Sequence, residues 1–226
     1  MLELPPIFLA AFTGFISGLL LCIPVGPVNI TILNEGARCG FKWAALIGLG
    51  ATAMEVIYCA IAFTGFAAFF ETGWIKSVME VFSFAFMLFL GVRFLIAKRV
   101  PLVENIEQRI EERIEERLHP HSAFMIGFVR TLANPGVLLG WIILSANFIS
   151  RGWVEPNRES KLACLAGVTV SVGLWFTGLS WAISLGHKKF TEKTMVKMER
   201  LSGVGLIVLA MIQGGYIAWK LAKHKM

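Results

Sequence analysis

Charged residues are scarce in this sequence of 226 residues. Asp, Glu, Lys and Arg make up 16% of it and hydrophobic residues 56%, whereas soluble domains usually have about 25% and about 45–50%. Four stretches contain no charged side chain at all: residues 4–34, 131–150, 162–186 and 201–219. Apolar runs of this length predict helices that span a lipid bilayer. The composition therefore argues against a water-soluble globule and excludes most classes of soluble enzyme.

Motifs of soluble chemistry are also missing. The four cysteines form no CxxC pair, and no GxSxG, P-loop or HExxH pattern occurs. The histidines lie in predicted loops or in the C-terminal tail, away from other metal ligands; they are His119, His121, His187 and His224. We expect no enzyme activity, no cofactor and no resident metal. Nucleic acid is not an expected partner, because no aromatic and basic binding surface is visible.

The apolar runs predict six membrane spans. They lie at about residues 8–33, 43–70, 78–97, 123–149, 162–185 and 201–221. The remaining residues are too few to bury a separate core outside the membrane. We therefore predict an all-α integral membrane protein with one transmembrane domain, 1–226. Residues 1–97 hold three spans, residues 98–121 form a charged cytoplasmic linker, and residues 122–226 hold three more.

The distribution of basic residues predicts the orientation of the spans. The loops after spans one, three and five carry 12 Lys and Arg, and the opposite side carries 7. Because basic loops tend to stay in the cytoplasm, both termini are expected outside the cell membrane. The formal charge of +6 is then a consequence of membrane topology, and the lipid bilayer is the expected surrounding of the chain.

The charged linker contains a regular pattern of isoleucines. Apolar side chains recur every four residues within 103–118, and the unit Ile-Glu-Glu-Arg occurs twice. This spacing predicts an amphipathic helix. Such a helix suits a connector that lies on the membrane surface. A helix that binds a partner protein is the alternative that the sequence leaves open.

The first span is interrupted by the segment Pro24-Val25-Gly26-Pro27-Val28-Asn29. Pro24 and Pro27 each lack a backbone donor and clash with the preceding turn, and Gly26 permits conformations closed to other residues. The helix is therefore expected to break here. Irregular backbone at membrane depth is tolerated only when it is buried in protein or lines a wet cavity. We expect Pro24, Gly26, Pro27 and Asn29 to border a cavity, a kink that only aids packing being the alternative.

The fourth span repeats this interruption with Asn134 and Pro135, about a dozen residues from its start and so near the middle of the membrane. Each interrupted span opens a group of three, so one group must be inserted upside down relative to the other. Paired interrupted helices in inverted repeats point to a transporter with its site at the midplane. Helices 1 and 4 are thus predicted to supply the binding site.

Two charged residues inside the spans are further candidates for the site. Glu55 lies deep in the second span, where a carboxylate costs at least about 2.5–3.5 kcal/mol and must face a partner, water or a proton. It is predicted to relay a proton or to bind an amine, a register-fixing hydrogen bond being the alternative. Arg130 lies some eight residues into the fourth span. A salt bridge between Glu55 and Arg130 is a hypothesis.

The sequence resembles the LysE-type translocators, the family of lysine and homoserine/threonine exporters. The resemblance rests on residues 24–29 with Glu35, Gly36 and Arg38, on 48–55, on Leu90-Gly91, on Asn134-Pro135 and on Ser202-Gly203. It implies a small inner-membrane exporter of amino acids or related metabolites that is driven by the proton gradient and is often oligomeric. Pro24, Gly26, Pro27 and Asn29 match the family's first break, Asn134 and Pro135 its second, and Glu55 its acidic position.

The chain departs from the family pattern at two places. Gly136 stands where the family often has Lys, and an aromatic run, Phe82, Phe84, Phe86 and Phe89, replaces a pattern of Gly and Tyr in the third span. These departures leave the transported solute open.

The sequence therefore predicts a proton-coupled secondary transporter that exports amino acids or related metabolites by alternating access, with a homo-oligomer as a possible assembly. The solute is expected to be zwitterionic, with its carboxylate near freed backbone N–H groups and asparagine side chains. One alternative is a metal-cation exporter with six spans, and another is a membrane scaffold that uses the 103–118 helix.

Overall fold

The computed structural model describes residues 5–24, 26–65, 73–96, 122–185 and 192–223. Within these ranges the chain forms helices joined by short turns and contains no strand, which confirms the predicted all-α class. The helices are α1 (Pro6–Cys22), α2 (Pro27–Cys39), α3 (Phe41–Gly65), α5 (Gly73–Ile96), α7 (Ala123–Leu132), α8 (Pro135–Ser150), α9 (Arg158–Ser184) and α10 (Glu192–Lys223). The predicted linker 98–121, with its 103–118 helix, lies outside the described residues.

Both predicted helix interruptions are present. The axes of α1 and α2 differ by 72°, and those of α7 and α8 by 65°. Pro27 begins α2 and Pro135 begins α8, as expected of a residue that has no N–H to donate and is tolerated in the first helical turn. Each interruption therefore ends one helix and starts another instead of bending a continuous one.

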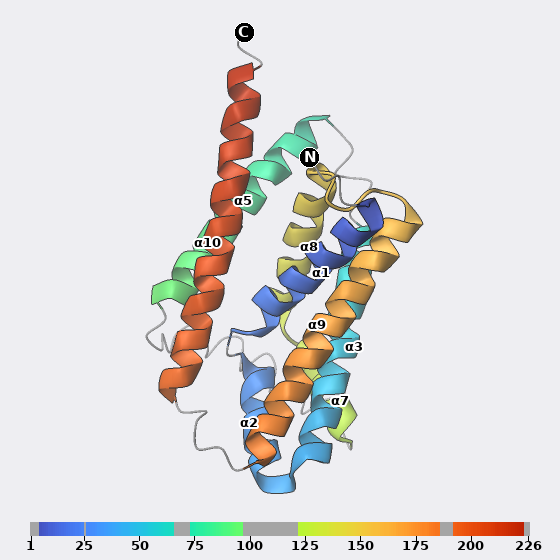
Figure 1. Ribbon diagram of the computed structural model, residues 1–226, viewed down its shortest axis with the longest axis vertical. Coiled ribbons are helices and arrows are strands. Elements are labelled where there is room, and N and C mark those ends of the chain that lie inside the picture. Colours follow the sequence, from blue (N-terminus) through green and yellow to red (C-terminus); the bar gives the residue numbers. More distant parts are fainter. Residues whose placement is uncertain (1–4, 25, 66–72, 97–121, 186–191, 224–226) are drawn as a thin grey trace.

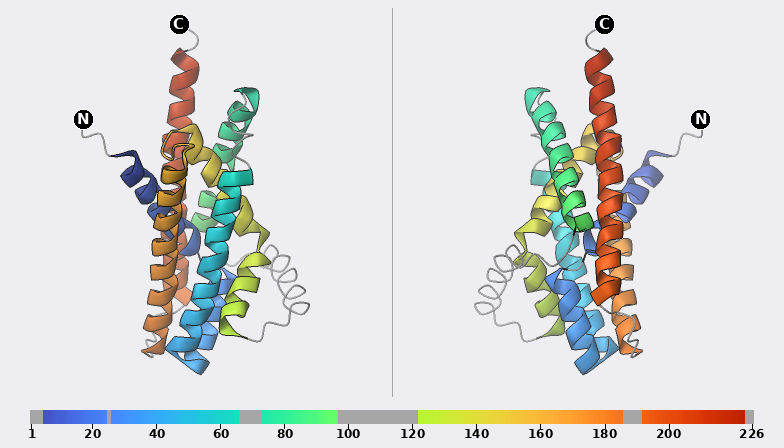
Figure 2. Two further views of the ribbon diagram at one scale, coloured as in Figure 1. Left: turned by 90° about the vertical axis from the view of Figure 1, so that its right-hand side faces the viewer. Right: turned by 90° about the vertical axis from the view of Figure 1, so that its left-hand side faces the viewer.

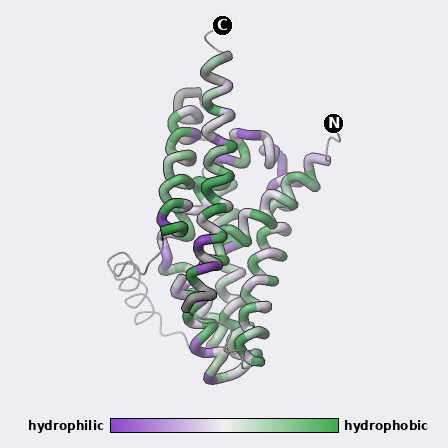
Figure 3. The backbone as a smooth tube through the Cα atoms, turned by 60° about the vertical axis from the view of Figure 1, so that its left-hand side comes forward, coloured by the Kyte–Doolittle hydropathy of each residue, from purple (hydrophilic) through white to green (hydrophobic). Residues whose placement is uncertain are grey.

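Three to five membrane spans are supported by the described residues. The helices at 41–64, 158–184 and 200–219 are long and apolar enough to cross a membrane singly, and the two bent pairs bring the number to five. The tube of Figure 3 is largely hydrophobic along these helices. The helix α5 lies where the third span is predicted, but it is not in this set, so the prediction of six spans is matched only in part.

Helices α3 and α9 form the centre of the fold. They pack against each other and run in opposite directions (Figure 1). The first half of each broken pair packs on one of them, α1 on α9 and α7 on α3, while α10 packs on α5 and α5 packs on α8. The start of α1 and the end of α10 lie at the same end of the molecule (Figures 1 and 2).

Glycines bring these helices into backbone contact. A Cβ atom on Gly14 of α1 would lie 2.1 Å from the carbonyl oxygen of Cys164 in α9, and one on Gly167 would lie 2.0 Å from that of Ala11. Real Cβ atoms essentially never approach so closely. Small residues at such interfaces let apolar helices associate in a membrane, where the hydrophobic effect does not draw them together.

The contact between α3 and α7 has the same form. A Cβ atom on Gly127 would lie 1.8 Å from the carbonyl oxygen of Ile47, and one on Gly50 would lie 1.9 Å from that of Phe124. The residues of the two interfaces match with constant offsets, 113 positions from α1 to α7 and 117 from α3 to α9. The matched pairs are Ala11 with Phe124, Gly14 with Gly127, Ile47 with Cys164, and Gly50 with Gly167.

The contact between α5 and α10 has the same form, and each of these two helices is the counterpart of the other. A Cβ atom on Gly91 of α5 would lie 3.0 Å from the carbonyl oxygen of Gly203 in α10, and one on Gly203 would lie 2.7 Å from that of Gly91. The backbone nitrogens that face these glycines, of Ile207 and Leu95, also correspond. The two halves of the described chain thus make the same glycine contacts in the same register.

Adding a methyl group at these interfaces is expected to destabilise the protein. Gly50→Ala and Gly167→Ala place a Cβ against the backbone of the neighbouring helix, so each is expected to lower the free energy of unfolding by about 1–3 kcal/mol. The measurement is the melting temperature of the purified protein in detergent, followed by size-exclusion chromatography after heating.

Gly173→Ala, in the same helix as Gly167, is the matched control. A Cβ there has no neighbour within 4 Å, so helix propensity alone is expected to keep or raise stability, by up to about 1 kcal/mol. Equal melting temperatures for Gly167→Ala and Gly173→Ala would contradict the packing described.

Candidate functional site

The side chain of Asn29 holds the first interruption together. Its Nδ2 atom donates hydrogen bonds to the carbonyl oxygens of Cys22, at 3.0 Å, and Pro24, at 2.8 Å. Carbonyls at the end of a helix have no partner within the helix, and Asn29, which is 5% exposed, supplies one. Gly26 is extended, and its N–H donates to the Pro24 carbonyl at 2.9 Å. Asn29 therefore links α2 to the carbonyl groups of Cys22 and Pro24 that precede it.

Helix α9 reaches this turn through an indole group. The Nε1 atom of Trp175 donates to the Oδ1 atom of Asn29 at 3.0 Å. The amide of Asn29 thus links the end of α1 and the turn after it to the central helix α9. Both polar atoms of the Asn29 side chain thus bond protein groups, and its contact with the solute stays a prediction.

The second interruption is also held by an asparagine and an aromatic donor, although they bond different backbone groups. The Oδ1 atom of Asn134 caps α8 by accepting from the backbone nitrogens of Gly136, at 3.0 Å, and Val137, at 3.3 Å. The hydroxyl group of Tyr58 in α3 donates to the carbonyl oxygen of Leu132, the last residue of α7, at 2.6 Å. An asparagine and an aromatic donor therefore serve each break.

The two aromatic donors occupy matching positions in the two halves. Trp175 lies 117 positions after Tyr58, which is the offset that relates the glycine contacts of α3 to those of α9. Tyr58 belongs to the first half and holds the break in the second, and Trp175 belongs to the second half and holds the break in the first. Each half therefore supplies the hydrogen bond that the other half's interrupted helix needs.

Glu55 lies one helical turn before Tyr58 on α3. It is 5% exposed, and its Oε2 atom accepts a hydrogen bond from the Nε1 atom of Trp141 in α8, a side chain with no exposed surface. The carboxyl group thus lies on the same helix as the donor that serves the second break, and it bonds α8, the helix that begins at that break.

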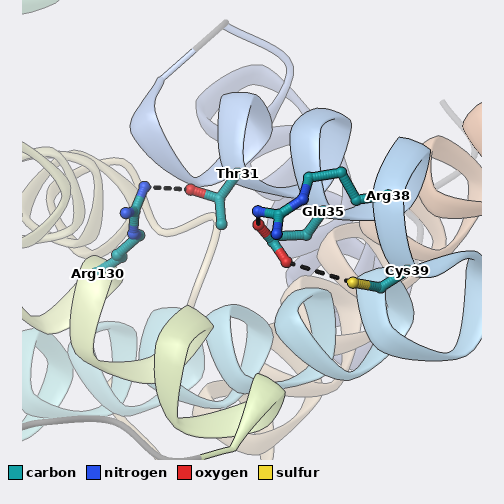
Figure 4. A network of polar contacts seen from close by, with 5 residues as sticks. All are labelled: Thr31, Glu35, Arg38, Cys39 and Arg130. Atoms are coloured by element: carbon teal, nitrogen blue, oxygen red, sulfur yellow. Dashed lines mark hydrogen bonds and ion pairs between the residues drawn. The ribbon is translucent and has the colours of Figure 1, made fainter.

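The salt bridge hypothesised between Glu55 and Arg130 is not formed by these described residues. The Nη1 atom of Arg130, in the last turn of α7, donates instead to the Oγ1 atom of Thr31 in α2 (Figure 4). Thr31 in turn donates to the Pro27 carbonyl at 2.8 Å. The hypothesis fails because Glu55 faces α8 whereas Arg130 faces the first turn of α2.

The other candidate residues take distinct places. Asn29 is buried, Asn134 and Gly26 are half-buried, and Pro135 is exposed. A Cβ on Gly26 would meet no atom within 4 Å, so no neighbouring group approaches this glycine closely.

Two turns along α2 from Thr31, Arg38 and Cys39 donate to the carboxylate of Glu35, at 3.1 and 3.7 Å (Figure 4).

Sequence reasoning did not identify the aromatic donors Tyr58, Trp141 and Trp175. A tryptophan or tyrosine inside an apolar span does not by itself indicate a site, because both are ordinary core residues. The signal that finds two of them is positional: the constant offset between spans two and five pairs Tyr58 with Trp175.

A model of the LysE type translocator family matches residues 19–212. The chain belongs to this family. This membership and the apolar helices identify it as a multi-pass membrane protein of the translocator class.

The chain is similar to LysE family relatives over most of its length. YcgF of Bacillus subtilis (strain 168), named provisionally for amino acid efflux, is 24% identical over 197 residues, which cover 87% of this chain and 91% of YcgF. The arginine exporter protein ArgO of Enterobacter sp. (strain 638) is 28% identical over 94% of this chain and 93% of its own length. ArgO of Escherichia coli (strain K12) is 27% identical over 75% of each chain. No solved structure matches the chain.

The hydrogen bond between Trp141 and Glu55 is expected to stabilise the fold. Trp141→Phe removes the donor and leaves the buried carboxyl group short of a partner, which costs about 1–3 kcal/mol. The same substitution in a Glu55→Leu background removes no hydrogen bond, so its cost is expected to be smaller. The measurement is a double-mutant cycle of melting temperatures. Equal costs of Trp141→Phe in both backgrounds would contradict the pairing.

Proposed function

We propose that this protein exports amino acids across the inner membrane by proton-coupled alternating access around its two helix interruptions. Membership of the LysE family and similarity to relatives named for amino acid and arginine export support the substrate class. The observation that carries the site is that the buried Glu55 carboxyl group bonds Trp141 of α8 and lies one turn from Tyr58, the donor to the second interruption. The first solute to test is arginine.

The proposed architecture is six spans arranged as two inverted groups of three. The repeated glycine contacts, with offsets of 113 and 117 positions, support it, since inverted copies pack their equivalent helices in equivalent ways. Helix α5, with 24 residues, is about 36 Å long and so reaches across a bilayer of about 30 Å. It serves as the third span.

The orientation and assembly follow the sequence-based expectations. Both termini lie outside in this proposal, supported by the excess of basic residues in the alternate loops and by the start of α1 and the end of α10 at one end of the molecule. The proposal includes self-association of the protein, and its only support is the family resemblance. Its test is the mass of the purified protein in nanodiscs.

The start of α2 is the proposed site for the carboxylate of the solute. Gly26 precedes this helix and provides no side-chain cap, whereas Asn134 caps α8 with its own oxygen. The first backbone N–H groups of α2 therefore have no acceptor from a capping side chain. Uncapped N–H groups and the positive end of the helix dipole favour an anion. The amine or guanidinium of the solute then lies toward Glu55.

Glu55 is the proposed site of coupling. A carboxyl group among apolar helices is stable when it holds a proton or a cationic partner. Binding of the amine and binding of a proton at Glu55 exclude each other, so import of a proton can drive export of the solute. Trp141, the hydrogen-bond donor to Glu55, positions the carboxyl group for both.

Of the rival functions, neither is favoured by a specific observation. In the described part of the chain no group of three or more His, Cys, Asp or Glu is suited to hold a metal ion. The scaffold function would use the 103–118 helix, which lies outside the described residues.

Glu55→Gln is expected to abolish proton-driven export. The amide keeps an acceptor for Trp141 but cannot carry the proton, so the protein should remain folded in the membrane. The measurement is efflux of labelled arginine from proteoliposomes, with and without an imposed pH gradient. Wild type should respond to the gradient, and Glu55→Gln should exchange arginine without responding. A Glu55→Gln variant that still responds to the gradient would refute this role.

Tyr58→Phe and Trp175→Phe are expected to slow transport by similar factors. Each removes one hydrogen bond from an interruption, worth about 0.5–1.5 kcal/mol, and the two positions are equivalent in the proposed repeat. The measurement is the arginine exchange rate in proteoliposomes at saturating solute. Trp181→Phe, an exposed side chain of α9 outside the two breaks, is the control and should leave the rate unchanged. Normal rates in both variants would show that these hydrogen bonds play no part in the transport cycle.

A further inference from the structure

We propose that a second polar site, between α5, α8 and α10 at the end of α8, binds the head group of an amino acid on the outer side of the protein. The proposal rests on the proposed function and adds a site that the two interruptions do not contain. Its residues are Arg151, which follows α8, Asn147 one turn earlier, Gln213 in α10 and Glu80 in α5.

Arg151 is held in place by aromatic rings. Its guanidinium carbon lies 5.0 Å from the centre of the Trp153 ring and 5.3 Å from that of Tyr216, distances at which a cation is attracted to the ring faces. One of its nitrogens, Nη2, is buried and has no hydrogen-bond partner. A guanidinium fixed by stacking with an unused donor is suited to bind a carboxylate, the anion that arginine binds through two parallel hydrogen bonds.

The turn that carries Arg151 is rigid. Gly152 has a φ of +69°, a conformation that favours glycine, and the N–H of Trp153 donates to the Phe148 carbonyl at 2.9 Å. The Trp153 ring stacks on that of Phe148, with ring centres 6.5 Å apart. The guanidinium is therefore positioned before any ligand arrives, which reduces the entropic cost of binding.

Asn147 offers the complementary group. It is 4% exposed, and its Nδ2 atom donates to Gln213, whose own Nε2 atom donates to the Glu80 carbonyl at 2.8 Å. This chain of bonds fixes the amide so that its Oδ1 atom is buried with no hydrogen-bond partner. A buried acceptor left unpaired costs about 1–3 kcal/mol, and such groups in native proteins usually have a water, ion or ligand as partner.

The two unused groups match the two ends of an amino acid head group. Asn147 and Arg151 are four residues apart at the end of one helix and so lie on the same face. The carboxylate of the ligand binds Arg151, and its ammonium group binds Oδ1 of Asn147. An amino acid carries a carboxylate for Arg151 and an ammonium group for Asn147, whereas a simple anion has no group for Asn147.

Nearby groups offset only part of the cost of burying the Arg151 charge. Burial lowers the pKa of Arg151 from its usual value, while Tyr216 and Glu80 act in the opposite direction. An added carboxylate would offset the remaining cost of burying this charge.

The place of the site suggests its role. The turn after α8 lies at the same end of the molecule as the start of α1 and the end of α10 (Figures 1 and 2), the end assigned to the outside in the proposed topology. Arg151 and Trp153 are partly exposed there. A solute that leaves the interruptions toward the outside can therefore meet this second site before it is released.

The test measures the two directions of transport separately. Wild type and Arg151→Gln are reconstituted in proteoliposomes of known orientation, and KM and kcat for arginine are measured from the outer and the inner face. Loss of a charge-assisted carboxylate contact is expected to raise the outer KM about tenfold or more, with the inner KM nearly unchanged. Arg151→Lys, which keeps the charge but not the paired donors, should give an intermediate outer KM.

Arg158→Gln is the matched control, because Arg158 begins α9, directly after the turn that carries Arg151, and is exposed. It should leave both KM values unchanged. If Arg151→Gln lowers the yield of folded protein, the outer KM of Arg151→Lys decides the matter. An outer KM equal to wild type in the folded Arg151 variants overturns this site while leaving the proposed export intact. A wild-type protein that moves no amino acid overturns the proposed function and this site with it.

Discussion

The backbone groups left free at the two helix interruptions constrain the rest of this structure. Hydrocarbon offers no hydrogen bonds, so carbonyl and N–H groups released at membrane depth must find partners in the protein or in a wet cavity. Asn29, Asn134 and Tyr58 supply such partners, and Trp175 fixes the amide of Asn29. Each central helix therefore makes a hydrogen bond at the break of the other half.

The position of the buried acid follows from this arrangement. Tyr58 must stand next to the end of α7 to bond the Leu132 carbonyl, and Glu55, one turn away on the same helix, is thereby brought near the second interruption. Close packing at Gly50 and Gly127 sets the distance between the two helices. A substitution at a glycine interface is therefore connected to the chemistry of the site through the position of one helix.

The sequence predicted the helical class, both interruptions and the position of Glu55 deep inside a span, because proline geometry and the cost of charge in a membrane act locally. It did not predict that Glu55 bonds Trp141 instead of Arg130, since that depends on how far each helix is rotated about its axis. Glu80 was overlooked because it lies near the end of a span, yet packing of α10 against α5 buries it. Side-chain partners across helices depend on tertiary packing that residue spacing does not specify.

The central claim is that the two interruptions face an aqueous path and bind the exported solute together. Amide hydrogen exchange of the protein in nanodiscs, measured with and without arginine, tests it most directly. Peptides that cover residues 22–30 and 131–138 are expected to exchange faster than the middle of α9 and to slow when arginine is added. Exchange at both interruptions as slow as in the middle of α9, and unaffected by any amino acid, would contradict the claim.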